Sequence, residues 1–286
     1  MTTPASLPAT GQATAEPPRA PLPADLPEDG LLAVRDLTVR YGRRLGCAEV
    51  TFDLWPGEVL GIVGESGSGK TTLLNALTGR VAIDGGRRLY AVPADDGGGW
   101  VDLDTLSEPK RRLLMRRDWG IVHQHPRDGL RLAVSAGANI GEPLMALGAR
   151  HYGDIRSQAL GWLDKVEIAP ERIDDLPRTF SGGMQQRLQI ARNLVTGPRL
   201  VFMDEPTGGL DVSVQARLLD LVRGLVDEMG LAAVIVTHDL AVARLLAHRL
   251  MVMKEGRVVE SGLTDQVLDD PHHPYTQLLV SSVLQV

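Results

Sequence analysis

Residues 64–71 read Gly64-Glu65-Ser66-Gly67-Ser68-Gly69-Lys70-Thr71, a complete Walker A pattern. The apolar run Val59–Val63 precedes it and predicts a strand, and we expect a helix from Lys70 that stops at Gly79, a residue that favours helix ends. A glycine-rich turn between a strand and a helix exposes backbone N–H groups to phosphate oxygens, and the positive end of the helix faces the same anion. The stretch therefore predicts a P-loop that binds a nucleoside triphosphate.

Each residue type in the loop suits a part of such a ligand. Lys70 is expected to reach the β- and γ-phosphates, and the Thr71 hydroxyl is expected to bind Mg²⁺. The residues expected to contact the nucleotide here are Gly64, Glu65, Ser66, Gly67, Ser68, Gly69, Lys70, Thr71 and Thr72.

A second apolar run, Leu200–Met203, ends in the acids Asp204 and Glu205, which is a Walker B pattern. Open α/β sheets bind ligands at the carboxyl ends of their strands. Asp204 is therefore expected to hold the metal ion, and Glu205 to accept a proton from the attacking water or to orient that water.

Strands and helices alternate along most of the chain, which favours an α/β fold with a mostly parallel sheet. Helical periodicity without strand signal predicts an inserted helical subdomain at about 130–195. Residues 1–28 are rich in Pro and Ala and are expected to be a disordered tail, with one domain over 29–286. The glycine clusters in Asp84–Trp100 predict a surface loop or irregular hairpin.

Composition excludes several classes of function. The net charge of −6 over 286 residues gives no support for non-specific nucleic-acid binding. The single cysteine, Cys47, cannot form an internal disulfide or a multi-cysteine metal site. No apolar run is long enough to span a membrane and no secretory signal is visible, so we expect a cytoplasmic location.

The segment Ser181-Gly182-Gly183-Met184-Gln185 is expected to open a helix that runs to Thr196. Two glycines in a first helical turn lower helix stability, which makes sense if backbone N–H groups must approach an anion closely. The segment resembles the signature motif of ABC ATPases, with Phe180 where Leu is usual and Met184 where Gln is usual. The resemblance implies that this helix tip closes over the nucleotide of a second subunit.

Four further residues match motifs of the same family. Gln124 resembles the Q-loop glutamine, which touches Mg²⁺ and the water, and His238 resembles the switch histidine, which contacts the γ-phosphate. Asp211 resembles the D-loop aspartate, although Gly208-Gly209 departs from the usual Ser-Ala before it. Tyr41 stands at the distance from Walker A at which an aromatic residue stacks on adenine, and an ordinary strand aromatic is the other interpretation.

Together the motifs imply an ATPase that acts as a homodimer around two ATP molecules. The resemblance implies that catalysis uses Glu205, His238, Gln124 and Lys70, and that Thr71, Gln124 and Asp204 hold Mg²⁺. Ser181–Gln185 and Asp211 would reach the nucleotide of the partner subunit. The implied architecture adds an antiparallel β subdomain to the parallel sheet and the helical insertion.

Within the family, the chain most resembles the ATP-binding subunits of bacterial carbon–phosphorus lyase systems, which break down phosphonates. The resemblance covers about 31–286 and is carried by Phe52–Val59, His123-Gln124-His125-Pro126, Gly148–Ile155, Phe180–Arg187 and Asp269–Tyr275. It implies a soluble lyase core complex as partner.

Other functions stay open on the sequence. The ATPase of a peptide, nickel or phosphonate importer, with a membrane permease as partner, is the main rival. A small-molecule P-loop kinase would have no use for Ser181–Gly183, and an ATP-gated assembly factor would not need Glu205 or His238.

Overall fold

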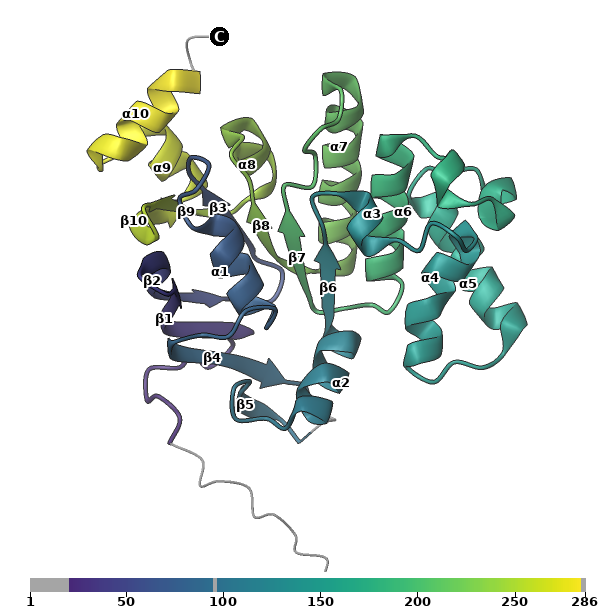
Figure 1. Ribbon diagram of the computed structural model, residues 1–286, viewed down its shortest axis with the longest axis horizontal. Coiled ribbons are helices and arrows are strands. Elements are labelled where there is room, and N and C mark those ends of the chain that lie inside the picture. Colours follow the sequence, from purple (N-terminus) through teal and green to yellow (C-terminus); the bar gives the residue numbers. More distant parts are fainter. Residues whose placement is uncertain (1–20, 95–96, 284–286) are drawn as a thin grey trace, which may run out of the picture.

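Six short strands form the central sheet in the order β10-β9-β3-β8-β7-β6, in a computed structural model that describes residues 21–94 and 97–283 (Figure 1). All neighbours pair in parallel except β10, which runs antiparallel to β9. The strands are β3 (Val59–Val63), β6 (Trp119–Val122), β7 (Leu200–Asp204), β8 (Ala232–Val236), β9 (Arg249–Lys254) and β10 (Arg257–Leu263). The α/β P-loop fold expected from the sequence is confirmed.

The strands at the centre of this sheet are buried on both faces, which explains why β3, β7 and β8 are continuous apolar runs. Alternate residues of β7 and β8 face two separate cores. One core contains α1 (Lys70–Leu77) and the other contains α6 (Gly182–Leu194), α7 (Val212–Met229) and α8 (Leu240–Leu246). Among the described residues, no helix combines the length and the apolar character needed to cross a bilayer.

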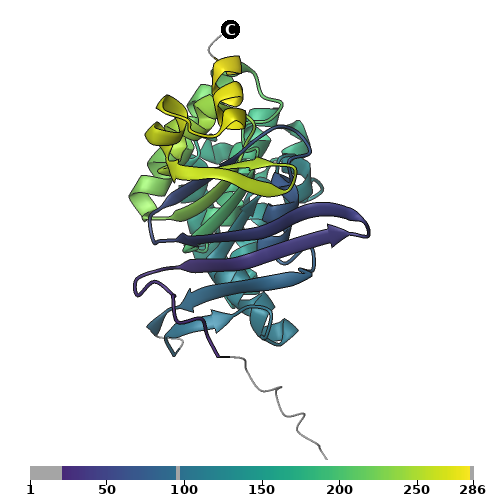
Figure 2. The same cartoon turned by 90° about the vertical axis from the view of Figure 1, so that its left-hand side faces the viewer.

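A smaller antiparallel sheet lies across one side of the molecule, in the order β2-β1-β4-β5 (Figure 2). Its strands are β1 (Leu32–Tyr41), β2 (Arg44–Leu54), β4 (Gly85–Val92) and β5 (Gly99–Asp102). The glycine-rich stretch is thus a hairpin, but the expected surface position is wrong for its first strand. Leu89 and Tyr90 are fully buried, Tyr90 in the core that contains α1, because β4 also pairs with β1.

A group of helices connects β6 to β7 and lies on the side of the molecule away from the small sheet (Figure 1). The group comprises α3 (Pro126–Gly129), α4 (Ala136–Ala146), α5 (Tyr152–Lys165), α6 and two short 3-10 helices, Pro170–Asp174 and Pro177–Thr179. The division into a tail and one domain stays a prediction, and residues 1–20 of the expected tail lie outside the described residues. Outside the group, α2 (Glu108–Asp118) precedes β6, and α9 (Thr264–Asp269) and α10 (Pro274–Val283) follow β10.

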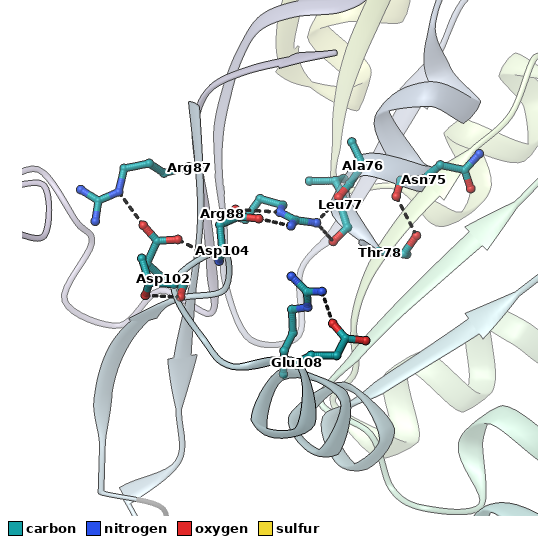
Figure 3. Close-up of polar contacts among 11 residues, drawn as sticks. Asn75, Ala76, Leu77, Thr78, Arg87, Arg88, Asp102, Asp104 and Glu108 are labelled. Carbon is teal, nitrogen blue, oxygen red and sulfur yellow. Dashed lines mark hydrogen bonds and ion pairs between the residues drawn. The ribbon is translucent and has the colours of Figure 1, made fainter. Parts of the chain in front are cut away.

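The far end of α1 is anchored by a buried arginine. Arg88, on β4, is 3% exposed and donates to the carbonyls of Ala76 and Leu77, the latter at 3.4 Å (Figure 3). Its guanidinium also pairs with Asp104, with one hydrogen bond of 3.1 Å from Nε to Oδ2. A cation at a helix C-terminus satisfies carbonyls that lack intrahelical partners and interacts favourably with the helix dipole. The helix that begins at the P-loop is therefore fixed to the antiparallel sheet.

We expect Arg88→Ala to lower the free energy of unfolding by about 3 kcal/mol, because it removes one partner of a largely buried ion pair and two carbonyl contacts. Chemical denaturation monitored by circular dichroism measures the change. Arg112→Ala is the matched control, since Arg112 pairs with Glu108 at the surface and should shift the midpoint little. Equal effects of the two substitutions would contradict the anchoring role.

Candidate nucleotide-binding site

A cavity of about 740 Å³ opens at the carboxyl ends of the parallel strands. Loops that follow β3, β6, β7 and β8 meet there. This is the place where open α/β sheets usually bind their ligands. The residues that line it are Tyr41, Arg44, Leu45, Gly46, Gly64, Glu65, Ser66, Gly67, Gly69, Lys70, Thr71, Thr72, Gln124, Glu205, His238 and Leu279.

The P-loop backbone has a positive φ at Gly64, Gly67 and Gly69, and at the first and last of these close packing also leaves no room for a side chain. Gly64 has φ +148°, and a Cβ there would lie 2.3 Å from the Met253 carbonyl oxygen. Gly69 has φ +104°, and a Cβ there would lie 2.4 Å from the carbonyl oxygen of Gly46. Both glycines therefore let the loop pack tightly onto β2 and β9 while it curves around the cavity.

Lys70 is the first residue of α1 and only 5% exposed. Its ammonium donates to the carbonyl oxygens of Gly64 at 2.7 Å and Glu65 at 2.8 Å. Burial lowers the pKa of Lys70, and the nearby carboxylates of Glu205 and Asp204 act in the opposite direction. A cation held by neutral carbonyls at the mouth of a cavity is poised to exchange them for an anion such as a phosphate.

Glu205 brings three loops together. Its Oε2 accepts a hydrogen bond from Gln124 Nε2 at 2.9 Å, and its Oε1 lies 2.9 Å from His238 Nδ1. The backbone at Glu205 has φ +42°, in the left-handed region that costs a non-glycine residue roughly 1–3 kcal/mol. Its N–H donates to the Val236 carbonyl at 2.8 Å, which holds this conformation against β8. The strained backbone aims the carboxylate into the cavity beside Lys70.

Asp204 lies beside this cluster rather than on the cavity wall. Burial raises the pKa of Asp204, and the like charge of Glu205 raises it further, while Lys70 and Arg80 lower it. A divalent cation between the two carboxylates and the phosphates of a nucleotide would relieve this repulsion.

The signature segment lies away from this cavity. None of Ser181–Gln185 lines the cavity, and neither does Asp211. Ser181 is exposed and caps α6, with its hydroxyl accepting a hydrogen bond from the Met184 N–H at 3.3 Å. Asp211 is also exposed, at the start of α7. One chain therefore does not bring the Walker A and signature segments together.

Three of the expected nucleotide contacts have other surroundings. Ser68 is buried and does not line the cavity, and its backbone N–H donates to the Glu65 carbonyl at 3.2 Å. Gln185 is turned inward and donates to the carbonyls of Pro177 and Phe180 at 2.9 and 3.2 Å. Gly183 is required by packing, because a Cβ there would lie 2.5 Å from Val214 on α7. Close approach to an anion is thus not the only reason for a glycine at this position.

A row of amide side chains joins α6 to the loop that carries Gln124. Gln189 accepts a hydrogen bond from the His123 N–H at 2.7 Å and donates to the His123 carbonyl at 3.1 Å. Gln186 donates to the same carbonyl at 3.3 Å, and Asn193 accepts from the Ile121 N–H at 3.0 Å. Gln186 and Gln189 are fully buried, so the contact is shielded from water.

The sequence analysis missed several residues of the wall. Arg44, Leu45 and Gly46 reach it from β2, next to the exposed ring of Tyr41. Leu279 reaches it from α10 near the end of the chain. No local pattern marks these four residues, because only the folded arrangement brings them to the P-loop.

Comparison with protein families agrees with this geometry. The family model described as ABC transporter matches residues 47–208, and the model described as oligopeptide/dipeptide transporter, C-terminal region, matches residues 259–286. The chain is 70% identical over 255 residues to the phosphonates utilization ATP-binding protein PhnK of Escherichia coli (strain K12), covering 89% of this chain and 98% of PhnK. It is 36% identical to the glutathione import ATP-binding protein GsiA of the same organism, covering 88% of this chain and 41% of GsiA.

Solved structures are similar in fold. The dimeric ATP-binding cassette MJ0796 in a post-hydrolysis state with ADP and Pi aligns with a TM-score of 0.71 and 28% identity, over 82% of this chain and 99% of that one. CbiO1 from Clostridium perfringens, part of the ABC transporter complex cbiONQ, aligns with a TM-score of 0.72 and 29% identity, over 85% and 92% of the two chains. With a family match over more than half of its length, the chain belongs to the ABC transporter family and is an ATP-binding ATPase.

Proposed function

We propose that this chain is the ATPase subunit of a phosphonate-degrading complex and works as a homodimer that encloses two ATP molecules. The 70% identity to PhnK over 98% of the length of that protein carries the proposal. The soluble carbon–phosphorus lyase core complex expected from the sequence is the proposed partner. The cytoplasmic location expected from the sequence is part of the same proposal.

The residues around the cavity support a division of labour in hydrolysis. Lys70 would exchange the Gly64 and Glu65 carbonyls for the β- and γ-phosphates. Glu205 would orient the attacking water and accept its proton, with Gln124 and His238 holding its two carboxylate oxygens. Positioning and charge stabilisation supply most of the catalysis in such phosphoryl transfers.

The chain offers a fitting set of ligands for Mg²⁺. Thr71, Gln124 and Asp204 supply oxygen donors, which this hard cation prefers. Burial raises the pKa of Asp204 most and the like charge of Glu205 raises it further, so a nearby dication would stabilise the ionised carboxylate. Bound there, Mg²⁺ would neutralise charge on the phosphates.

A dimer would complete the site with the segments that one chain leaves outside the cavity. Ser181 and Asp211 are exposed, and Val212 beside Asp211 is 81% exposed. The free N–H groups at the tip of α6 would face the γ-phosphate of the partner subunit. The dimeric state of the MJ0796 cassette supports this arrangement.

An importer is the second candidate. The match of residues 259–286 to the C-terminal region of oligopeptide/dipeptide transporters and the 36% identity to GsiA favour it. In that case the partner would be a membrane permease instead of a soluble enzyme complex.

Lys70→Ala is expected to weaken ATP binding by about ten- to a hundredfold, because charge-assisted hydrogen bonds to the phosphates are lost. Isothermal titration calorimetry measures the affinity. Lys165→Ala, which removes a surface lysine paired with Glu228, should bind ATP normally. Unchanged ATP affinity in Lys70→Ala would count against the Walker A assignment.

Glu205→Gln is expected to bind ATP but to lower turnover by about 10²–10⁴-fold, since the general base is removed while the geometry of its contacts is kept. The variant should also form a long-lived dimer with ATP, seen as a shift in size-exclusion chromatography. Glu228→Gln is the matched control at the surface. Near-normal phosphate release by Glu205→Gln would show that Glu205 has a different role.

Affinity purification of the Glu205→Gln variant from native cells with ATP and Mg²⁺ tests the partner. We expect soluble lyase subunits to co-purify, because the trapped ATP-bound dimer keeps its partner surface in one state. A membrane permease in their place would support the importer. The Lys70→Ala variant, which should not form the dimer, is the control for non-specific capture.

A further inference from the structure

The C-terminal helix α10 reaches the P-loop from the other end of the chain. The hydroxyl of Tyr275 accepts a hydrogen bond from the Glu65 N–H at 3.0 Å, across 210 positions of sequence. One turn further along α10, Leu279 lines the nucleotide cavity. The helix is therefore part of the surroundings of the ATP site.

The tyrosine holds one particular peptide unit. The N–H of Glu65 and the carbonyl of Gly64 belong to the same planar peptide group, so their directions are linked. The Gly64 carbonyl oxygen accepts a hydrogen bond from the Lys70 ammonium at 2.7 Å. Gly64 has φ +148°, in a region where the backbone is restrained little by its own residue. The hydrogen bond from outside the loop therefore fixes the carbonyl on which Lys70 rests.

The position of Tyr275 is itself well determined. Tyr275 is 6% exposed, belongs to the core on a helix that contacts α9, and has the Lys254 ammonium 5.0 Å from the centroid of its ring. The ring nitrogen of His273 accepts the Tyr275 N–H at 3.1 Å. Glu260, on β10, accepts the N–H groups of His272 and His273 at 2.8 and 3.0 Å. The two histidines thus form a capped turn that delivers the tyrosine to the loop.

We propose that Tyr275 is a positioning residue for ATP binding, which holds the Gly64–Glu65 peptide so that the P-loop stays shaped for phosphate. Tyr275 does not line the cavity, and the hydrogen bonds of the described residues join its hydroxyl to Glu65 and not to Glu205, Gln124 or His238. Its removal should therefore act on the binding of ATP and leave the chemical step nearly unchanged.

Tyr275→Phe in the full-length chain removes only the hydroxyl and keeps the packed ring. We expect the KM for ATP, and the Kd by calorimetry, to rise about three- to tenfold, which corresponds to the loss of one typical hydrogen bond. The kcat should stay within about twofold of the unaltered chain, because the general base Glu205 and its partners Gln124 and His238 are held by one another and not by the tyrosine.

Tyr90→Phe is the matched control for the loss of a buried tyrosine hydrogen bond. The Tyr90 hydroxyl donates to Asp118 at 3.2 Å, and Tyr90 does not line the cavity. This variant should lower the thermal midpoint and leave KM unchanged. An unchanged KM and Kd in Tyr275→Phe, an equal rise in Tyr90→Phe, or a fall in kcat alone would each overturn the proposal. The assay uses the chain's own ATPase activity, so failure to find a lyase partner would not affect it.

Discussion

The rest of the site depends on the burial of one ammonium group at the edge of the parallel sheet. An ion taken out of water costs several kcal/mol unless partners surround it. Lys70 finds the carbonyls of Gly64 and Glu65, with the carboxylates of Asp204 and Glu205 nearby. These groups meet only because β3, β7 and β8 are parallel neighbours whose carboxyl ends lie side by side.

The loop around this ion is supported from both halves of the chain. Arg88 fixes the far end of α1 to the antiparallel sheet, which is built from the N-terminal part. From the C-terminal part, the Gly256 N–H donates to the Ser68 carbonyl at 2.9 Å, and Tyr275 reaches Glu65. The Walker A pattern does not reveal these supports, because the residues that provide them lie outside the pattern, Tyr275 by 210 positions from its partner Glu65.

The sequence predicted the parallel strands of the central sheet, because each is an apolar run followed directly by a polar motif. Polar residues that follow parallel strands lie at the same edge of the sheet, and the structure brings Lys70, Gln124, Glu205 and His238 to one cavity there. The sequence also predicted a hairpin at the glycine-rich stretch but not the burial of its first strand, because that burial comes from pairing of β4 with β1. It assigned Gln185 to the nucleotide, although this side chain holds the preceding loop. Leu279 and Gly46 could not be found, because their neighbours at the cavity are remote in sequence.

The amide side chains of Gln186 and Gln189 hold α6 to His123, beside Gln124, so we expect the helix and this loop to move together. The helix has 13 residues, and its tip lies about 8–12 Å from the contacts of Gln186 and Gln189 with His123, at a rise of ~1.5 Å per residue. A tilt of about ten degrees at that fulcrum would carry the tip by roughly 2 Å, enough to make or break hydrogen bonds. In the proposed dimer, the nucleotide that lies beside Gln124 in a subunit's own site would thus affect how tightly the α6 tip of that subunit contacts the nucleotide of the partner subunit.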